Sequence, residues 1–144
     1  TGALAYGQAV GVYLAFVVDK MADYNSSMCS WRTAGGNLRS TFGRQAIPMV
    51  WTFAEGNPFS SVSGNFKTML GSVAETVEHL GCGSPAVVSQ DNALTMEHPR
   101  NVMVCTELPY YRDIGYADLS DFFYIWLRRS LRQYLFPWNI QRSS

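Results

Sequence analysis

Apolar residues follow a helical pattern at both ends of the chain and near its middle. Residues 3–23 are apolar on most of the surface of a helix, which predicts one long helix packed on two sides. Residues 65–81 and 118–136 repeat apolar positions at helical spacing, and Asp118 or Ser120 can cap the last segment. The sequence therefore predicts three helices.

Two other runs are short and continuously apolar. They are SPAVVSQDNAL, residues 84–94, and NVMVCTE, residues 101–107. Such runs are typical of strands buried on both faces of a parallel sheet. Helix, strand, short loop, strand and helix is the order of α/β proteins, so the predicted fold class is α/β, with parallel strands flanked by helices.

The intervening segments predict loops and a single domain. Residues 32–44 are rich in Gly, Ser and Arg, which favours an exposed loop, and Pro48 suits either the first turn of a helix or a short strand. The 144 residues suit one domain, with a helical and loop region over 1–60 and a strand–helix part over 61–144.

Composition and charge narrow the class of protein. Hydrophobic residues make up 47% and charged residues 15%, as in a globular protein, and 11 basic residues balance 11 acidic ones. The apolar run 4–18 is short of the about 20 residues that a membrane span needs. Cys29, Cys82 and Cys105 lack Cys-x-x-Cys spacing, so we expect small buried thiols in a reducing, cytoplasmic compartment, with no metal and no disulfide.

An acid, a proline and tyrosines follow the second apolar run, in the stretch TELPYY of residues 106–111. The stretch QDN of residues 90–92 follows the first run, and ligands of α/β sheets bind at the carboxyl ends of strands. An acid and a carbonyl can accept hydrogen bonds from an exocyclic amine, while a ring stacks on a planar base. The sequence thus indicates a site for a nucleobase.

The segment VMVCTELPYYRDIGYADLSDFFYIWLRR, residues 102–129, resembles the catalytic segment of amino-group DNA methyltransferases, which contains Asp-Pro-Pro-Tyr. It is most similar to adenine-specific DNA methyltransferases of the DUF1156 type, which continue into a stretch like residues 116–124. The segments ADYNSSMCSW and TFGRQAIPMVWTFAEGNPFS also look like that family, so the resemblance covers about residues 6–131. It implies a partial Rossmann-like fold of the S-adenosylmethionine-dependent methyltransferase type.

The resemblance also implies an activity, which is transfer of a methyl group from S-adenosyl-L-methionine to N6 of adenine in DNA. Glu107 takes the place of the family's Asp, Leu108 that of the first Pro, Pro109 that of the second, and Tyr110 that of the stacking aromatic residue. The acid and the carbonyl of the next residue would hold the amine toward the methyl group.

Further residues receive roles from the same resemblance. Asp91 or Asn92 would contact the adenine of the cofactor, although a turn or helix cap is the plainer interpretation of these side chains. Tyr111 and Tyr116 would line the pocket for the target base. Apart from the resemblance, the loop that contains Arg39, Arg44 and Gln45 could contact the DNA substrate or close over the site, although a plain surface loop explains these residues as well.

Two departures from the family pattern qualify this expectation. Glu107 is one methylene longer than Asp, and Leu108 lacks the ring that fixes φ in proline. No glycine-rich cofactor loop occurs in the chain, which predicts that it works as part of a larger or split enzyme with a missing upstream segment. The alternatives are a non-catalytic remnant that binds nucleic acid or protein, or an enzyme acting on RNA or a small molecule.

The other candidate residues have structural interpretations. Arg128, Arg129 and Arg132 could contact phosphates, but a solvated helix face is favoured. Asp118 and Asp121 are interpreted as caps and partners of the helix dipole. The four tryptophans are expected in the core; they are Trp31, Trp51, Trp126 and Trp138.

Overall fold

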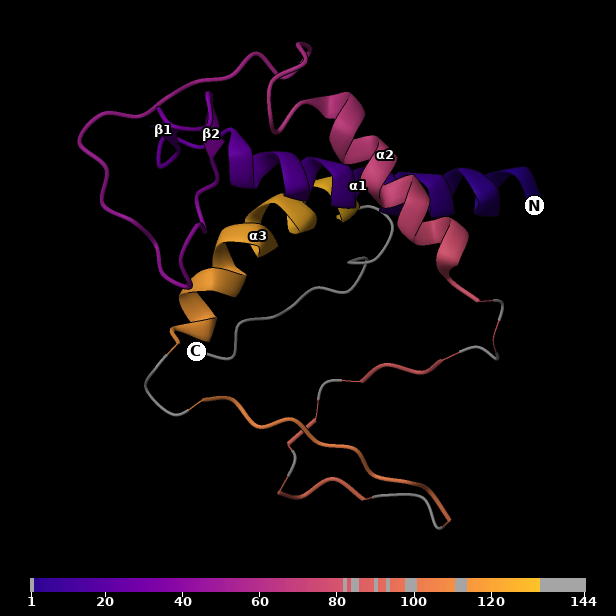
Figure 1. Ribbon diagram of the computed structural model, residues 1–144. Helices are drawn as coiled ribbons and strands as arrows, with labels where there is room; N and C mark the ends of the chain where they lie inside the picture. Colours follow the sequence, from indigo (N-terminus) through magenta and orange to yellow (C-terminus); the bar gives the residue numbers. More distant parts are fainter. Residues whose placement is uncertain are drawn as a thin grey trace.

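The structure is a computed structural model of the chain, and it describes residues 2–81, 83, 86–89, 91–92, 94–97, 101–110 and 114–132. Its elements are α1 (Gly2–Tyr24), β1 (Ser30–Arg32), β2 (Asn37–Arg39), α2 (Phe66–His79) and α3 (Tyr116–Leu131). Helix α1 packs against both α2 and α3, and the two strands lie near its C-terminal end (Figure 1). The predicted packing of the first helix on two sides is thus confirmed.

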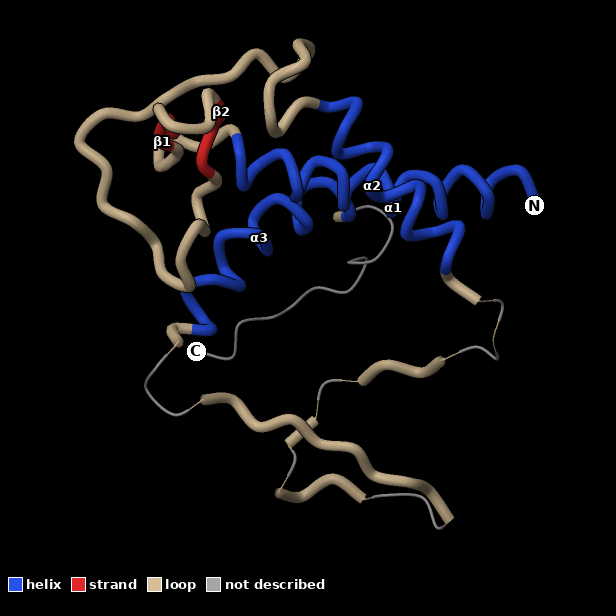
Figure 2. The backbone as a smooth tube through the Cα atoms, in the orientation of Figure 1, coloured by secondary structure: helices blue, strands red, loops and turns tan. Residues whose placement is uncertain are grey.

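The predicted α/β fold is wrong. Among the described residues the only sheet is the antiparallel pair β1 and β2, and the rest is helix or loop (Figure 2). The described parts of the two expected parallel strands are loop, and their apolar side chains are exposed, with Val87 at 95% and Met103 at 90%. Because a buried strand needs neighbours for its N–H and C=O groups, these runs cannot form strands without pairing segments.

Helices α1 and α2 begin and end close to their expected positions. Asn65 is the N-cap of α2, where its side-chain oxygen accepts a hydrogen bond from the backbone N–H of Thr68 at 2.9 Å. The preceding Gly64 has φ of 80°, and a Cβ there would clash with the side chain of Tyr24. A glycine is therefore required where the chain turns from the loop into α2.

Helix α3 begins earlier than the sequence suggests. Its N-cap is Gly115, and Asp118 lies in the first turn, where a negative charge is favourable, instead of at the cap. The Ser120 hydroxyl donates to the carbonyl of Ala117 at 3.0 Å, so it is not a cap either. The expected continuation of this helix beyond residue 132 lies outside the described residues.

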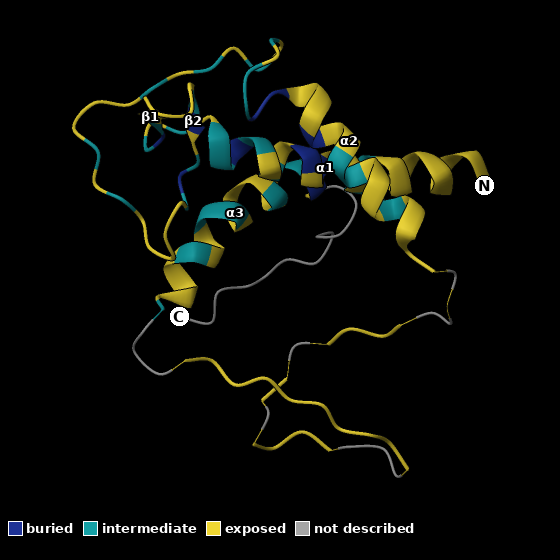
Figure 3. Cartoon of the chain, in the orientation of Figure 1, coloured by how far each residue is buried: buried dark blue, intermediate teal, exposed yellow. Residues whose placement is uncertain are grey.

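The core lies where the three helices and the hairpin meet (Figure 3). Val17 of α1 is completely buried, and small buried side chains on both sides of it, Ala15 and Ala22, allow neighbouring segments to approach closely. The remaining buried apolar residues come from the other elements and are Cys29, Leu38, Met69 and Leu131. The core is small for the length of the chain, since many large apolar side chains are exposed.

The segment expected as an exposed loop over residues 32–44 contains most of the hairpin. Gly36, with φ of 58°, lies in the turn between β1 and β2, in the left-handed region that glycine adopts without strain. Residues 45–55, expected as a helix or short strand, form neither. The hairpin pairs Ser30 with Arg39 and Trp31 with Leu38.

Several predictions about buried residues are wrong. Trp31, Trp51 and Trp126 are all exposed, with Trp51 at 92%, and Trp138 lies outside the described residues. Cys29 is buried but Cys105 is exposed; both are free thiols, and Cys82 lies outside the described residues. The described tryptophans are therefore all exposed, against expectation, and of the described thiols only Cys29 is buried as expected.

The expectation that the N-terminal apolar run is too short for a membrane span does not hold for α1 as a whole, because this helix of 23 residues is long and apolar enough to cross a membrane by length and composition. It is the only such helix in the described part of the chain, and it lies near the N-terminus. The core helix of a soluble protein passes the same test, so these two properties do not assign α1 to a membrane. Its contacts with α2 and α3 give it a structural role in this fold.

Candidate functional site

The C-terminal end of α1 holds the chain at residues 41–42. The carbonyl of Asp23 accepts hydrogen bonds from the backbone N–H of Thr41 at 2.7 Å and from its hydroxyl at 2.8 Å. The Asp23 carboxylate accepts a third bond, from the backbone N–H of Phe42 at 3.1 Å. Burial raises the pKa of Asp23, and the Phe42 N–H partly opposes that rise because it stabilises the charged form.

Phe42 in turn contacts helix α3. Its ring lies 5.0 Å from that of Phe122, nearly perpendicular to it, and 5.3 Å from that of Phe123. Edge-to-face pairs of this kind add about 0.5–1.5 kcal/mol beyond the burial of apolar area. The three rings therefore connect α3, through Phe42 and Asp23, to the end of α1.

Helix α3 places Tyr116 next to the tetrapeptide of residues 107–110. The backbone N–H of Tyr110 donates a long hydrogen bond of 3.5 Å to the hydroxyl of Tyr116. All four residues of the tetrapeptide are exposed, as is Tyr116. The structure thus brings together two of the tyrosines expected at the base site, while Tyr111 lies outside the described residues.

The expected cofactor contacts Asp91 and Asn92 form a local turn. The Asp91 carboxylate accepts from the backbone N–H of Asn92 at 2.8 Å, and the Asn92 side chain accepts from the backbone N–H of Leu94 at 3.0 Å. These bonds are typical of a turn stabilised by Asp and Asn side chains, which is the structural interpretation of these residues. Within the described residues no hydrogen bond connects Asp91 or Asn92 to the tetrapeptide.

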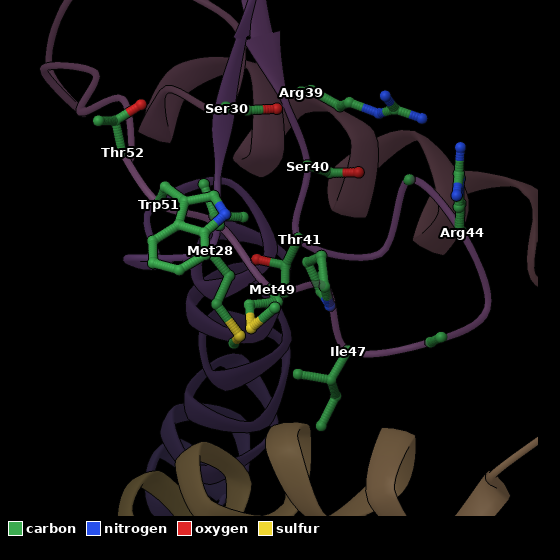
Figure 4. A pocket seen from close by; sticks show the side chains of 14 residues that line it. Met28, Ser30, Arg39, Ser40, Thr41, Arg44, Ile47, Met49, Trp51 and Thr52 are labelled. Atoms are coloured by element: carbon green, nitrogen blue, oxygen red, sulfur yellow. The ribbon is translucent and has the colours of Figure 1, made fainter.

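Arg44 lies elsewhere, in a pocket between the hairpin and the loop that follows it (Figure 4). The pocket has a volume of about 540 Å³. Arg39 and Arg44 lie on one side of it, and Trp51 lies on the other beside Met28 and Met49 (Figure 4). Sequence reasoning noted both arginines as possible DNA contacts but placed Trp51 in the core.

A second cavity of about 530 Å³ lies between α1, α2 and α3 and contains an acid that sequence reasoning missed. Burial raises the pKa of Asp19 from its ordinary 3.8 to about 6. Its Oδ1 atom is buried and has no hydrogen-bond partner among the described residues. The sequence contains a signal that could have indicated this buried acid, because Asp19 follows a long apolar run in a helix that packs on two sides.

Comparisons with known proteins show no family for this chain. No family model, no curated protein and no solved structure matches it. The chemistry of the site therefore rests on its own residues. They offer an exposed carboxylate and two neighbouring tyrosines at residues 107–116, and a separate basic and aromatic pocket in the hairpin region.

Proposed function

We propose that the chain takes part in S-adenosylmethionine-dependent methylation of adenine N6 in DNA, as one part of a larger or split enzyme. The observation that supports this most directly is the contact between Tyr110 and Tyr116 beside the exposed residues Glu107 and Leu108. A ring, a carboxylate and a backbone carbonyl that are all accessible can receive a base lifted out of the duplex.

The chain's own residues would bind and orient the target base. The Glu107 carboxylate and the Leu108 carbonyl would accept hydrogen bonds from the exocyclic amine, and the Tyr110 ring would stack on the base. Stacking of a base on an aromatic side chain contributes about 1–3 kcal/mol. Holding the amine in one orientation can lower the barrier by several kcal/mol, because less entropy is lost at the reaction step.

The two residues expected to contact the cofactor do not form a cradle for it. Asp91 and Asn92 are exposed, and their side chains form hydrogen bonds within their own turn. We therefore assign the methyl donor, which supplies the transferred group, to a part of the enzyme outside these residues. This chain contributes the binding and orientation of the base.

The test is a methyl-transfer assay on adenine-containing DNA with radiolabelled donor, using the complete polypeptide or assembly that contains this chain. Glu107→Gln should lower kcat by about 100-fold, since a misplaced or weakened contact to the amine has that cost. Glu97→Gln is a matched control, because Glu97 is also an exposed glutamate in a loop. We expect the control to keep its activity.

A variant with increased activity would be a further test. The Glu107 side chain is one methylene longer than Asp, so its carboxylate lies about 1.5 Å from where an Asp would place it. The double variant Glu107→Asp with Leu108→Pro should therefore raise the rate of methyl transfer. Tyr110→Ala should raise KM for DNA, whereas Tyr6→Ala, at an exposed position of α1, should not. No transfer by any form, or equal rates for Glu107→Gln and Glu97→Gln, would favour a non-catalytic binding role.

A further inference from the structure

Three arginines lie on and beside one face of the hairpin. The antiparallel register pairs Ser30 with Arg39 and Arg32 with Asn37, so Arg32 and Arg39 project from the same face. A hollow of about 410 Å³ beside Arg32 shares Arg39, Ser40 and Gly43 with the pocket that contains Arg44. The positive charges therefore form one continuous surface across two hollows.

A tight turn places Arg44 next to Arg39. The backbone N–H of Gly43 donates to the carbonyl of Ser40 at 3.3 Å, which folds the chain back toward β2. A Cβ at Gly43 would approach Nε of Arg39 to 2.7 Å, so the Arg39 side chain lies directly over this glycine. Figure 4 shows both arginine side chains on the same side of the pocket.

Neither Arg39 nor Arg44 forms an ion pair within the described part of the chain, and no acidic residue lines the pocket. Two arginines whose charges are not matched by an acid attract an anion, and a guanidinium matches the geometry of a phosphate. S-adenosylmethionine has a net positive charge, so this pocket does not suit the methyl donor.

The opposite side of the pocket is apolar and aromatic. Trp51 is 92% exposed, which leaves its ring accessible, and Met28 and Met49 lie beside it (Figure 4). The backbone N–H of Ala54 donates to the carbonyl of Cys29 at 3.0 Å and so fixes the loop of Trp51 beside β1. The pocket therefore has one side for a phosphate and one for a planar ring.

We propose that this pocket binds a single nucleotide unit of an unpaired DNA strand, with its phosphate on Arg39 and Arg44 and its base stacked on Trp51. A base within a duplex is stacked on its neighbours and cannot reach such a ring, so the strand must be open at this position. The inference rests on the proposed function, because the same strand would supply the target adenine.

The experiment is fluorescence anisotropy of an end-labelled single-stranded oligonucleotide of about 12 nucleotides, titrated at several salt concentrations without a methyl donor. The variants are Arg39→Gln with Arg44→Gln, and Trp51→Ala. The matched controls are Arg128→Gln with Arg129→Gln on exposed positions of α3, and Trp31→Ala, an exposed tryptophan outside the pocket. Circular dichroism checks that every variant is folded.

The double arginine variant should bind at least about tenfold more weakly, and its salt slope should be shallower by about 1.4, since each phosphate contact to a single strand contributes about 0.7. Trp51→Ala should weaken binding by about tenfold. Both controls should stay within about twofold of the unchanged chain. Equal losses in the variants and their controls would overturn the proposal, because the binding would then be non-specific.

Three further outcomes separate the alternatives. Equally tight binding of a free mononucleotide would show that the pocket takes a small ligand and would overturn the assignment to a strand. Tighter binding of the matching ribo-oligonucleotide would overturn the assignment to DNA. Binding is measured without methyl donor, so absence of methyl transfer would not contradict nucleotide binding by this pocket. Normal methylation with unchanged KM for DNA in the double arginine variant would refute nucleotide binding by the pocket but not the proposed methylation.

Discussion

Replacement of Asp19 by Asn should stabilise the protein at neutral pH. Asp19 lines the cavity between the three helices, and its Oδ1 atom is buried with no hydrogen-bond partner among the described residues. Its neighbour Lys20 donates instead to the Ser72 hydroxyl, at 3.1 Å. Asn keeps the shape of the side chain and removes the charge, and therefore removes the cost of burying a carboxylate.

The size of the effect follows from the pKa of Asp19. It rises from its ordinary 3.8 to about 6 on folding, because burial disfavours the charged form. Each tenfold change in proton affinity corresponds to about 1.4 kcal/mol, which sets an upper limit of about 3 kcal/mol. Asp19 is only half-buried, so solvent screens the charge and we expect about 1 kcal/mol.

The sign of the pH dependence is fixed by the direction of the pKa shift. Between pH 3.8 and about 6 the folded state binds more protons than the unfolded state, so Asp19 destabilises the fold increasingly as the pH rises through this range. The Asp19→Asn variant lacks this dependence, because an amide does not titrate there. The variant should therefore be more stable by about 1 kcal/mol above about pH 7, and the difference should nearly vanish at about pH 4.

Urea denaturation followed by far-UV circular dichroism measures this difference. With an m-value of about 1.5 kcal/mol/M, a gain of about 1 kcal/mol raises the midpoint by about 0.7 M urea. Asp121→Asn at an exposed position of α3 removes the same charge and should change stability by less than about 0.5 kcal/mol. A variant less stable than the unchanged chain at neutral pH, or a difference independent of pH, would refute the reasoning.

Two further changes test the local structure. Asn65→Ala should lower the free energy of unfolding by about 1 kcal/mol, because it removes the N-cap bond to the Thr68 N–H; Asn65→Asp should keep most of the stability, and equal losses in both would contradict the capping role. Thr41→Val should cost about 1–3 kcal/mol in urea denaturation, since the buried Thr41 hydroxyl bonds the Asp23 carbonyl at 2.8 Å and lies 2.6 Å from the Ser26 hydroxyl. Thr41→Ser, which retains the hydroxyl, should lose less, and the reverse order would show that the methyl group matters more.

The exposed loops bear on the proposal that the chain works as one part of a larger enzyme. The apolar side chains of Val87, Val88 and Met103 are almost fully exposed, and burial of a Val or Met side chain is worth about 1.5–3 kcal/mol. A partner segment that covers these runs would therefore gain apolar burial. This agrees with the proposal that the chain works as one part of a larger or split enzyme.

The three helices could be predicted from the sequence because their hydrogen bonds are local. Each backbone N–H in a helix bonds a carbonyl four residues earlier, so apolar spacing and caps within one segment are enough to indicate it. The same reasoning failed for the runs at residues 84–94 and 101–107. A strand needs a partner from elsewhere in the chain, and a short apolar run contains no information on whether that partner exists.

The candidate sites also contain some features that the sequence indicates and others that it does not. The tetrapeptide Glu107–Tyr110 could be selected from the sequence, because its resemblance to a catalytic segment lies within contiguous residues. The contact of Tyr110 with Tyr116, and the meeting of Arg39 and Arg44 with Trp51, could not. They depend on where α3 begins, on the register of the hairpin and on the bond between Ala54 and Cys29, which are set by contacts between segments distant in sequence.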